Sequence, residues 1–362
     1  MATNYKQLTS LTSGSQYQYR VTAIGDGTTY TDSEPSAIAN FTTLIPLATP
    51  TGLALQRATT SITATWNAVT NATGYVVAYA TTNGTWTESE VAAAAFTLSG
   101  ASSGTTYDFK VKAIAPNSAY EASEYSAVVS TTTLIKLATP VPTITKTTSS
   151  ITIQWSAIAN ATGYVVAWKA AGGSYTEESV ATTSFTKSPI SEGETYTFKV
   201  QAVTTNPDYE NSEYSAEISD SAQITLATPA PTLTKTTSSI TATWSAIPNA
   251  GGYVLAYKTG AGSYTEVDVS TTSYTLDNLA SGATYTIKVK ATSNSDDYVD
   301  SAYSSERSAT TLIPLATPGN IAVDEITSTS ARIGWDSVAN ASGYKVQYRI
   351  AGETEWQEVT LV

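Results

Sequence analysis

The chain of 362 residues contains no cysteine and no histidine. Without cysteine there is neither a disulfide nor a thiolate site, and without histidine there is no ordinary catalytic triad, no imidazole base and no His-ligated zinc. Charged residues are few, and 30 acidic against 18 basic side chains give a net charge of −12, which argues against nucleic acid and anionic membrane as partners. No apolar run approaches the length of a membrane span, and no charged-then-apolar signal segment begins the chain.

Paired carboxylates are the only remaining resource for catalysis, because two acids can drive glycoside hydrolysis. Here the acids fall on expected strand faces and loop tips and show no sign of a shared cleft. We therefore expect a protein without enzymatic activity, catalytic residues, cofactor or metal.

An internal repeat organises the chain. The signature Leu-Ala-Thr-Pro begins at Leu47, Leu137, Leu226 and Leu315, and an equivalent tryptophan recurs at Trp66, Trp155, Trp244 and Trp335. This period of roughly ninety residues suits one β-sandwich per repeat.

The copy at 137–225 shows the strand pattern most clearly. Alternating apolar positions rich in β-branched and aromatic residues, bounded by Gly, Asn, Ser and Pro, predict about seven short antiparallel strands. The inward faces of three of these strands are expected to consist of Ile151, Ile153, Trp155, Tyr164, Val166, Trp168, Tyr196, Phe198 and Val200. The positions between them are mostly polar and should face water.

Three motifs together carry a resemblance to a known family. They are a Trp on the second strand, Gly163-Tyr-x-Val-x-aromatic on the third, and Gly193-x-x-Tyr-x-aromatic-x-Val on the sixth. The unit resembles a fibronectin type III module, with Tyr196 in the tyrosine-corner place; an immunoglobulin domain proper fits less well, because no cysteine pair flanks the Trp. The resemblance implies an all-β chain of tandem seven-stranded fibronectin-type-III-like β-sandwiches.

We expect three complete modules, at 47–136, 137–225 and 226–314, flanked by two complementary half-modules. Residues 1–46 match only the last three strands of the repeat (E, F and G), and residues 315–362 match only the first four (A, B, C and C′). The joints carry proline and β-branched residues and no Gly/Ser run, so we expect a stiff rod in which each module adds on the order of 30–40 Å.

An aromatic residue on strand C′ is the first candidate site. It is Trp86, Tyr175, Tyr264 or Trp356, and an acid follows two residues later in each copy. The aromatic shares its face with this acid, so we expect it to face outward, where it can stack on a sugar ring or a partner protein. The alternative is packing on the Lys stem of a neighbouring strand or on an adjacent module.

Acidic loops between the last two strands are a second candidate. The segments from Asp208 to Glu213 and from Asp296 to Asp300 offer the oxygen ligands that calcium prefers. Their spacing does not match an EF-hand, and a solvated turn is the alternative.

Asparagine recurs between strands B and C. Asn71, Asn160 and Asn340 begin formal N-glycosylation sequences, whereas Asn249 fills the same place without the required hydroxyl residue. A role in the turn that precedes Gly-Tyr is therefore favoured.

The two ends read as one interrupted module. Aligning the tail with the third module passes from Val362 to Ala2 without gap or overlap. Each half alone would leave inward-facing residues and strand edges uncovered, so we expect tail-to-head contact between copies, giving an open filament unless the rotation per module closes a ring. The expected interface residues are Tyr5, Leu11, Tyr17, Tyr19, Val21, Trp335, Tyr344, Val346, Tyr348, Val359 and Leu361. The alternative is a superrepeat excised from a longer array, with frayed ends.

The residues and the resemblance together favour a non-catalytic structural protein, bacterial and extracellular or on the cell surface, whose main partner is a further copy of itself. The alternative is a carbohydrate- or protein-binding spacer array from an adhesin or a polysaccharide-degrading enzyme, with glycans or surface proteins as partners. The expectation of secretion rests on the resemblance alone, because no targeting segment is recognised in the sequence.

Overall fold

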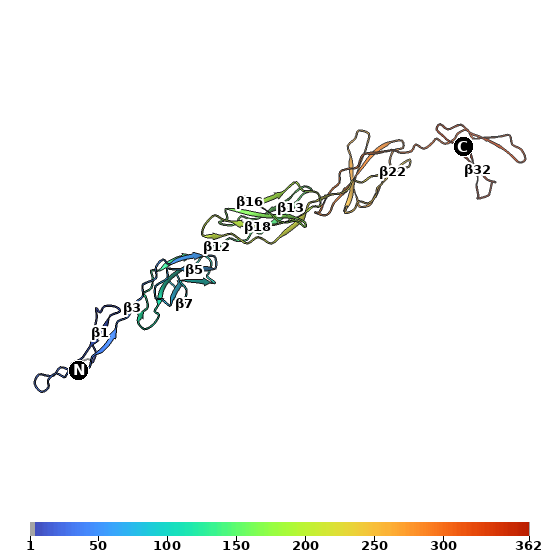
Figure 1. Cartoon of the computed structure of the whole chain (residues 1–362). Coiled ribbons are helices and arrows are strands. Elements are labelled where there is room, and N and C mark those ends of the chain that lie inside the picture. Colours follow the sequence, from blue (N-terminus) through green and yellow to red (C-terminus); the bar gives the residue numbers. More distant parts are fainter. Residues whose placement is uncertain (1–3, 362) are drawn as a thin grey trace. The chain divides into compact units, whose positions relative to one another are not determined.

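The computed structural model describes residues 4–361, in which every regular element is a β-strand (Figure 1). The expected seam between Val362 and Ala2 lies outside the described residues. The chain divides into two compact units, one holding residues up to 145 with 152–186 and 196–219, and the other holding 146–151, 187–195 and the residues from 220 onward. The boundary between the units passes through the repeat at 137–225.

The first complete repeat forms two antiparallel sheets. Its strands are β4 (Ala54–Arg57), β5 (Ser61–Thr65), β6 (Gly74–Thr81), β7 (Thr87–Val91), β8 (Ala95–Ser99), β9 (Thr106–Ile114), β10 (Tyr120–Glu121), β11 (Val129–Thr132) and β12 (Ile135–Lys136). One sheet has the order β4-β5-β8, and the other has the order β11-β9-β6-β7. With the strands lettered A, B, C, C′, E, F and G in chain order, these are an A-B-E sheet and a G-F-C-C′ sheet.

The next two repeats keep this strand order. The strands of the second are β13 (Thr143–Lys146), β14 (Ile151–Gln154), β15 (Gly163–Ala170), β16 (Thr176–Val180), β17 (Ser184–Lys187), β18 (Thr195–Val203), β19 (Tyr209–Glu210), β20 (Ile218–Ser221) and β21 (Ile224–Thr225). The strands of the third are β22 (Thr232–Lys235), β23 (Ile240–Thr243), β24 (Gly252–Thr259), β25 (Thr265–Val269), β26 (Ser273–Leu276), β27 (Thr284–Thr292), β28 (Tyr298–Val299) and β29 (Arg307–Thr310).

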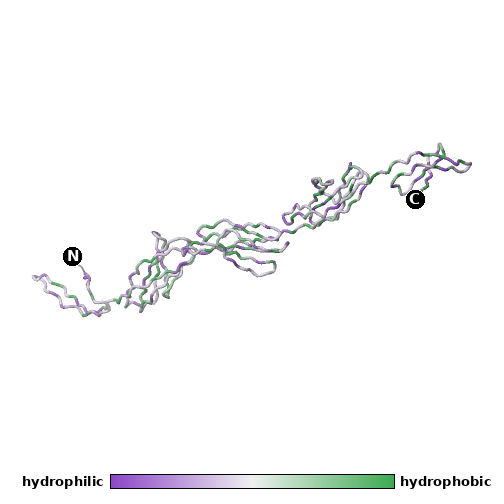
Figure 2. Tube along the Cα trace, turned by 90° about the horizontal axis from the view of Figure 1, so that it is seen from above, coloured by the Kyte–Doolittle hydropathy of each residue, from purple (hydrophilic) through white to green (hydrophobic). Residues whose placement is uncertain are grey.

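Apolar side chains of the two sheets meet in a core. In the first repeat Ile62, Val77 and Phe109 are fully buried, and the Trp66 indole meets the Tyr75 ring edge-on at a centroid distance of 5.3 Å. The third repeat has an equivalent cluster. Figure 2 shows hydrophobic and hydrophilic residues following one another along the strands, the alternation that places one face of each strand inward.

The predicted inward faces of the second repeat are confirmed. The buried residues among them are Ile151, Ile153, Trp155, Tyr164, Val166, Tyr196, Phe198 and Val200. Trp168, also on β15, is half-buried.

Asparagine fixes the turn between strands B and C. Asn71, Asn160, Asn249 and Asn340 all have φ between 63° and 65°, a left-handed conformation in which Asn is enriched. The prediction that these residues serve the turn is confirmed.

The terminal segments hold the strands of half a repeat each. Those of the head, residues 1–46, are β1 (Gln16–Tyr19), β2 (Ala39–Thr42) and β3 (Ile45–Pro46); those of the tail, residues 315–362, are β30 (Ala322–Asp324), β31 (Arg332–Gly334), β32 (Tyr344–Tyr348) and β33 (Gln357–Leu361). Strands β1 and β2 pair as F and G, β30 and β31 as A and B, and β32 and β33 as C and C′.

Strand E, which the sequence predicts in the head, is not formed. Residues 4–11 contain no strand. In the complete repeats strand E pairs with strand B, as β8 does with β5. The described part of the head holds no strand B, so the backbone near Tyr5 has no neighbouring strand there to bond.

Candidate functional site

Short parallel strand pairs lie at the joints between repeats. The linker strands β3, β12 and β21 pair with β10, β19 and β28, which lie in the loop between strands F and G of the following repeat. At the first joint the amides of Ile45 and Leu47 donate to the carbonyls of Ala119 and Glu121 at 3.0 and 2.9 Å. Pro46 stands between the two donors, at a position whose amide makes no ladder bond, so proline is tolerated there.

The same two bonds recur at the next two joints. Ile135 and Leu137 donate to Asp208 and Glu210 at 3.0 and 2.9 Å, and Ile224 and Leu226 donate to Asp297 and Val299 at 3.0 Å each. The joint geometry is therefore a property of the repeat.

Acids of the F–G loops pair with cations near the joints. Asp208 Oδ1 lies 2.9 Å from Nη2 of Arg57 in the preceding repeat, and Glu213 pairs with Lys136, a hydrogen bond that lowers the pKa of the Glu213 carboxyl. At the next joint the equivalent aspartate binds Lys146. The loops considered for calcium thus contact basic side chains, and between residues 4 and 361 no three acidic side chains gather closely enough to hold a metal ion.

The fourth joint differs from the other three. Residues 312–314 form no strand, and no F–G loop follows them in the described part of the tail. Ile313 is 73% exposed, whereas its three counterparts are 38–41% exposed, and Leu315 is 53% exposed where its counterparts are 5–7% exposed. The apolar side chains of this linker therefore lack the cover that their counterparts have.

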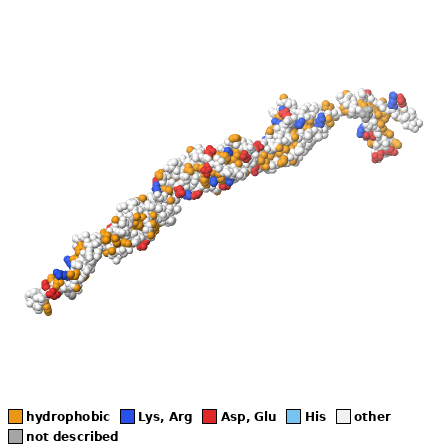
Figure 3. Space-filling model, in the orientation of Figure 1, with side chains coloured by type: hydrophobic (Ala, Val, Ile, Leu, Met, Phe, Trp, Pro, Cys, Tyr) orange, Lys and Arg blue, Asp and Glu red, His pale blue; other side chains and the backbone are white. Residues whose placement is uncertain are grey.

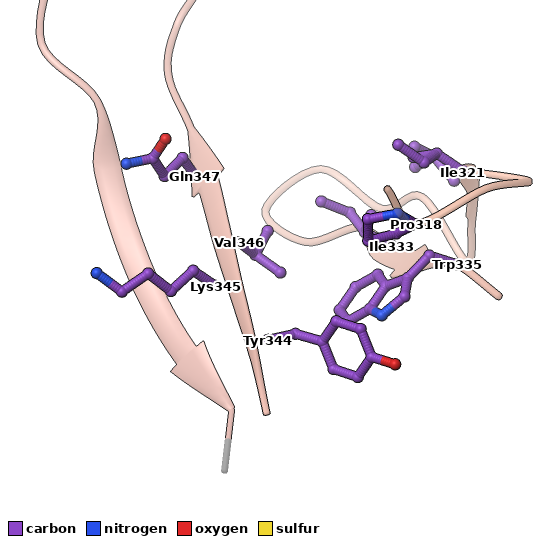
Figure 4. A pocket seen from close by; sticks show the side chains of 9 residues that line it. Pro318, Ile321, Ile333, Trp335, Tyr344, Lys345, Val346 and Gln347 are labelled. Atoms are coloured by element: carbon purple, nitrogen blue, oxygen red, sulfur yellow. The ribbon is translucent and has the colours of Figure 1, made fainter. Parts of the chain in front are cut away.

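The tail opens the inner face of its strands as a groove of about 320 Å³. Figure 4 shows Trp335, Tyr344 and Val346 pointing toward one another between the β31 and β32 segments, while Lys345 and Gln347 point away. The edges of this apolar face are exposed too, with Tyr348 at 53%, Val359 at 47% and Leu361 at 46%. In the complete repeats the residues at the Val346 position, Val77, Val166 and Leu255, are fully buried.

The head exposes residues of strand F that are buried in the complete repeats. Tyr19 is 48% exposed and Val21 is 64% exposed. At these two positions the complete repeats carry Phe109, Phe198 and Ile287, and Val111, Val200 and Val289, all fully buried. Figure 3 shows hydrophobic side chains at the surface of both terminal segments.

The other predicted head residues divide into two groups. Tyr5 is 81% exposed, whereas Leu11 and Tyr17 are half-buried. The Tyr17 hydroxyl accepts a hydrogen bond from the Thr12 amide at 2.8 Å, and its ring stacks on Phe41 at 5.5 Å. The corner around Tyr17 is therefore formed already, while Tyr5 has no apolar cover.

The predicted C′ aromatics lie under basic side chains. Lys110 Nζ stands 4.3 Å from the centroid of Trp86, and the equivalent distances are 4.3 Å for Tyr175 and 4.0 Å for Tyr264. In the tail the Arg349 guanidinium lies 4.4 Å from the Trp356 ring. Trp86 is 37% and Trp356 53% exposed, and the two tyrosines are half-buried. Each ring therefore already contacts a cation, as in the alternative in which the aromatic packs on a basic side chain. Stacking on a ligand stays a prediction.

A second tyrosine completes each cation site. Tyr125, Tyr214 and Tyr303 place their rings 4.5–4.6 Å from the same strand F lysines. Each hydroxyl also donates to the C′ acid, as Tyr214 does to Glu177 at 2.8 Å. Burial and, secondly, this hydrogen bond raise the pKa of Tyr214 to about 12. Neither this second ring nor the joint pairing was predicted from the sequence; the recurring Tyr before strand G and the recurring Tyr in the F–G loop were the available signals.

Comparisons with known proteins agree with this architecture. The family model described as fibronectin type III domain matches residues 48–132, 140–218 and 229–306. Chitinase A1 of Niallia circulans is 33% identical over 149 residues, which is 39% of this chain and 21% of that protein. The chain thus matches about a fifth of the length of this curated relative.

Among solved structures, the chicken CNTN1 FN1–FN3 domains are similar at 19% sequence identity with a TM-score of 0.37, over 74% of this chain and 100% of that one. Within the described range, no helix is long and apolar enough to cross a membrane.

Proposed function

Because the chain belongs to the fibronectin type III family, whose domains are typically non-catalytic modules, we propose that it is a structural spacer whose terminal half-modules complete each other between copies. Fibronectin type III repeats are typical of extracellular proteins, and we propose an extracellular or cell-surface location. The hydrogen-bonded joints suit a spacer, since they limit rotation about the linkers.

One observation carries the proposal. The apolar residues that the head exposes and those that the tail exposes correspond to residues that cover one another in a complete repeat. In the first complete repeat strand F lies beside strand C with Val77 and Val111 as register partners. The counterparts of this pair are Val346 in the tail and Val21 in the head. Among residues 4–361, β1 pairs with β2 alone and β32 with β33 alone, so each has a free edge and main-chain bonds would accompany the apolar contact.

A charge contact would be completed as well. Arg20 holds the position of Lys110 on strand F, and Trp356 holds the position of Trp86 on strand C′. Completion would bring the Arg20 guanidinium over the free face of the Trp356 indole, a contact of about 0.5–1 kcal/mol at an exposed site.

The partner we propose is a second copy of this chain. Head and tail are different surfaces, so their contact is heterologous and leaves one further head and one further tail free, which leads to an open filament unless the rotation closes a ring. An interface that fills half a sandwich core should be of obligate size, on the order of 2,000 Å².

Light scattering after size-exclusion chromatography tests the proposal on the full chain. We expect the mass to rise with concentration, and Val346→Asp to return the chain to monomer because a carboxylate would then enter the completed core. Val141→Asp is the matched control, since Val141 is 81% exposed on a complete repeat. A chain that stays monomeric at all concentrations would exclude the assembly.

Carbohydrate binding is the second candidate, favoured by the similarity to a chitinase and by the exposed edge of Trp86. Binding of the chain to a glycan array, lost on Trp86→Ala, would support it. Lys110 already covers one face of this ring, so we rank this function below the structural one.

A further inference from the structure

We propose that the fourth joint is a second contact between copies, in which the F–G loop of one head adds a parallel strand to the linker at Ile313 of the preceding copy's tail. This inference rests on the proposed completion of the split module and adds a defined pair of segments to it, residues 313–315 of one copy and 29–31 of the next.

The linker is already held in the conformation that the other joints use. The Leu312 amide donates to the Thr236 carbonyl at 2.8 Å, as the Leu134 amide does to Ala58 at 3.1 Å. Ile313 also lies against Gly282, because a Cβ placed there would be 3.1 Å from Ile313 Cδ1. The corresponding Gly104 gives 3.3 Å to Cδ1 of its isoleucine. This linker differs from the other three in having no partner strand among residues 4–361.

The donors of this linker are free for a partner. At the complete joints the amides two residues apart, such as Ile45 and Leu47, donate to the F–G loop. The amides of Ile313 and Leu315 make no hydrogen bond within residues 4–361. Pro314 stands where Pro46 stands in the first joint, so its missing amide costs no bond.

The loop of the head is ordered by its own hydrogen bonds. Asp26 Oδ1 accepts hydrogen bonds from the amides of Thr28, Thr29 and Tyr30 at 2.7–2.9 Å, and these bonds hold the pKa of the Asp26 carboxyl well below its usual range. The Tyr30 carbonyl accepts from Gly27 at 3.2 Å.

The carbonyls of this loop that correspond to the acceptors of the first joint are unoccupied within residues 4–361. The carbonyls of Thr29 and Thr31 accept nothing in the described part of the chain. They are the counterparts of Ala119 and Glu121, which accept from the linker at the first joint.

The exposed side chains fit the same pairing. Tyr30 is 71% exposed, whereas its counterpart Tyr120 is half-buried and packs against the core of the first repeat. In that core Leu47 is 7% exposed, and its counterpart Leu315 is 53% exposed. A second copy that supplies the missing half-core thus also brings its loop to the linker, and both exposed residues gain cover.

Cysteine cross-linking of the full chain tests the inference, because the native sequence has no cysteine to interfere. Glu121 and Pro46 are register partners at the first joint, so Thr31 and Pro314 should be partners between copies. We expect a mixture of the single variants Thr31→Cys and Pro314→Cys to form a disulfide-linked dimer under mild oxidation. The double variant Pro46→Cys with Glu121→Cys is the internal control and should close within one chain, because register partners lie within the reach of a disulfide.

Two further mixtures separate the outcomes. Arg20→Cys with Gln347→Cys probes the completed sheet itself, and Thr31→Cys with Val141→Cys measures random collision. We expect the joint pair to link about a hundredfold faster than the random pair, because docking raises the local thiol concentration to the millimolar range. A dimer through Arg20 and Gln347 without one through Thr31 and Pro314 would overturn the joint contact and keep the proposed function. No dimer from either pair would overturn both, and linking at the random rate would overturn the joint contact.

Discussion

Val21 and Val111 form a matched pair for testing the completion of the core. They occupy the same position of strand F, but Val21 is 64% exposed in the head, whereas Val111 is fully buried in a complete repeat. If a second copy covers Val21 as the first repeat covers Val111, Val21→Ala should weaken association and leave the complete repeats unchanged. Val111→Ala should do the reverse.

The magnitude follows from the atoms removed. Val→Ala deletes two methyl groups, at about 0.8 kcal/mol for each buried carbon, and a residual cavity adds to this loss. We expect about 2 kcal/mol in both variants. For Val21→Ala this corresponds to roughly a 30-fold weaker association constant, and for Val111→Ala to a lower free energy of unfolding of its own repeat.

Sedimentation velocity over a concentration series measures association, and calorimetry of the same samples measures repeat stability. The register also predicts a partner, because Val77 faces Val111 and Val346 should therefore face Val21. Val346→Ala should weaken association similarly, and the double variant should be non-additive, as expected for side chains in contact. Unchanged association in Val21→Ala, with the expected destabilisation in Val111→Ala, would refute the reasoning.

Three further predictions concern single repeats. Trp155→Ala should lower the free energy of unfolding by about 3–5 kcal/mol, because its indole is 6% exposed and packs on Tyr164 at 5.3 Å; a loss below about 1 kcal/mol in denaturant titration would contradict this packing. Asn249→Ala should cost about 1 kcal/mol, because the left-handed φ of 65° is tolerated by Asn, whose short polar side chain can hydrogen-bond locally, better than by Ala, whereas Asn249→Gly should be close to neutral by the same titration. Burial and, secondly, the Glu266 hydrogen bond raise the pKa of Tyr303 to about 12, so Tyr303 favours the folded state fully below pH 10 and loses this contribution as the pH rises through 12; ultraviolet titration of the folded chain should show its tyrosinate forming later than in the unfolded chain, and ionisation at the same pH in both states would contradict it.

Much of the fold follows from local sequence patterns. The period-two alternation around Trp155 and Tyr164 predicts which faces are buried, because each strand has one face toward solvent and one toward the core. The turn role of Asn249 also follows from local chemistry. Strand E of the head shows the limit of such reasoning, since Tyr5 and its neighbours have strand-like residues but lack the strand B that would pair with them.

The candidate site was predicted only in part. The apolar residues of both half-modules could be found from the alignment of the repeats. Packing of the C′ aromatics on a lysine of a neighbouring strand was foreseen as one of two alternatives, whereas the particular lysine and the second tyrosine at each site could not be identified. Lys110 on β9 reaches Trp86, which precedes β7, across the intervening strand β6, and Tyr125 approaches the same ammonium from the loop before strand G. Such contacts depend on side-chain reach between distant segments, and a single strand pattern carries no information about them. The linker pairing of Ile45 with Tyr120 is non-local in the same way.

The joint strands also couple the stability of each repeat to that of the next repeat along the chain. When a repeat melts, its F–G loop releases the linker that enters it, so each unfolding event also removes hydrogen bonds from the boundary with its predecessor. Stability in such an array is a sum of intrinsic and nearest-neighbour terms, and melting begins where a coupling term is missing. In a single chain that place is Ile313, at the edge of the third repeat. Joining copies would convert this edge into an interior boundary, so longer assemblies should melt at a higher temperature and more sharply than the chain alone.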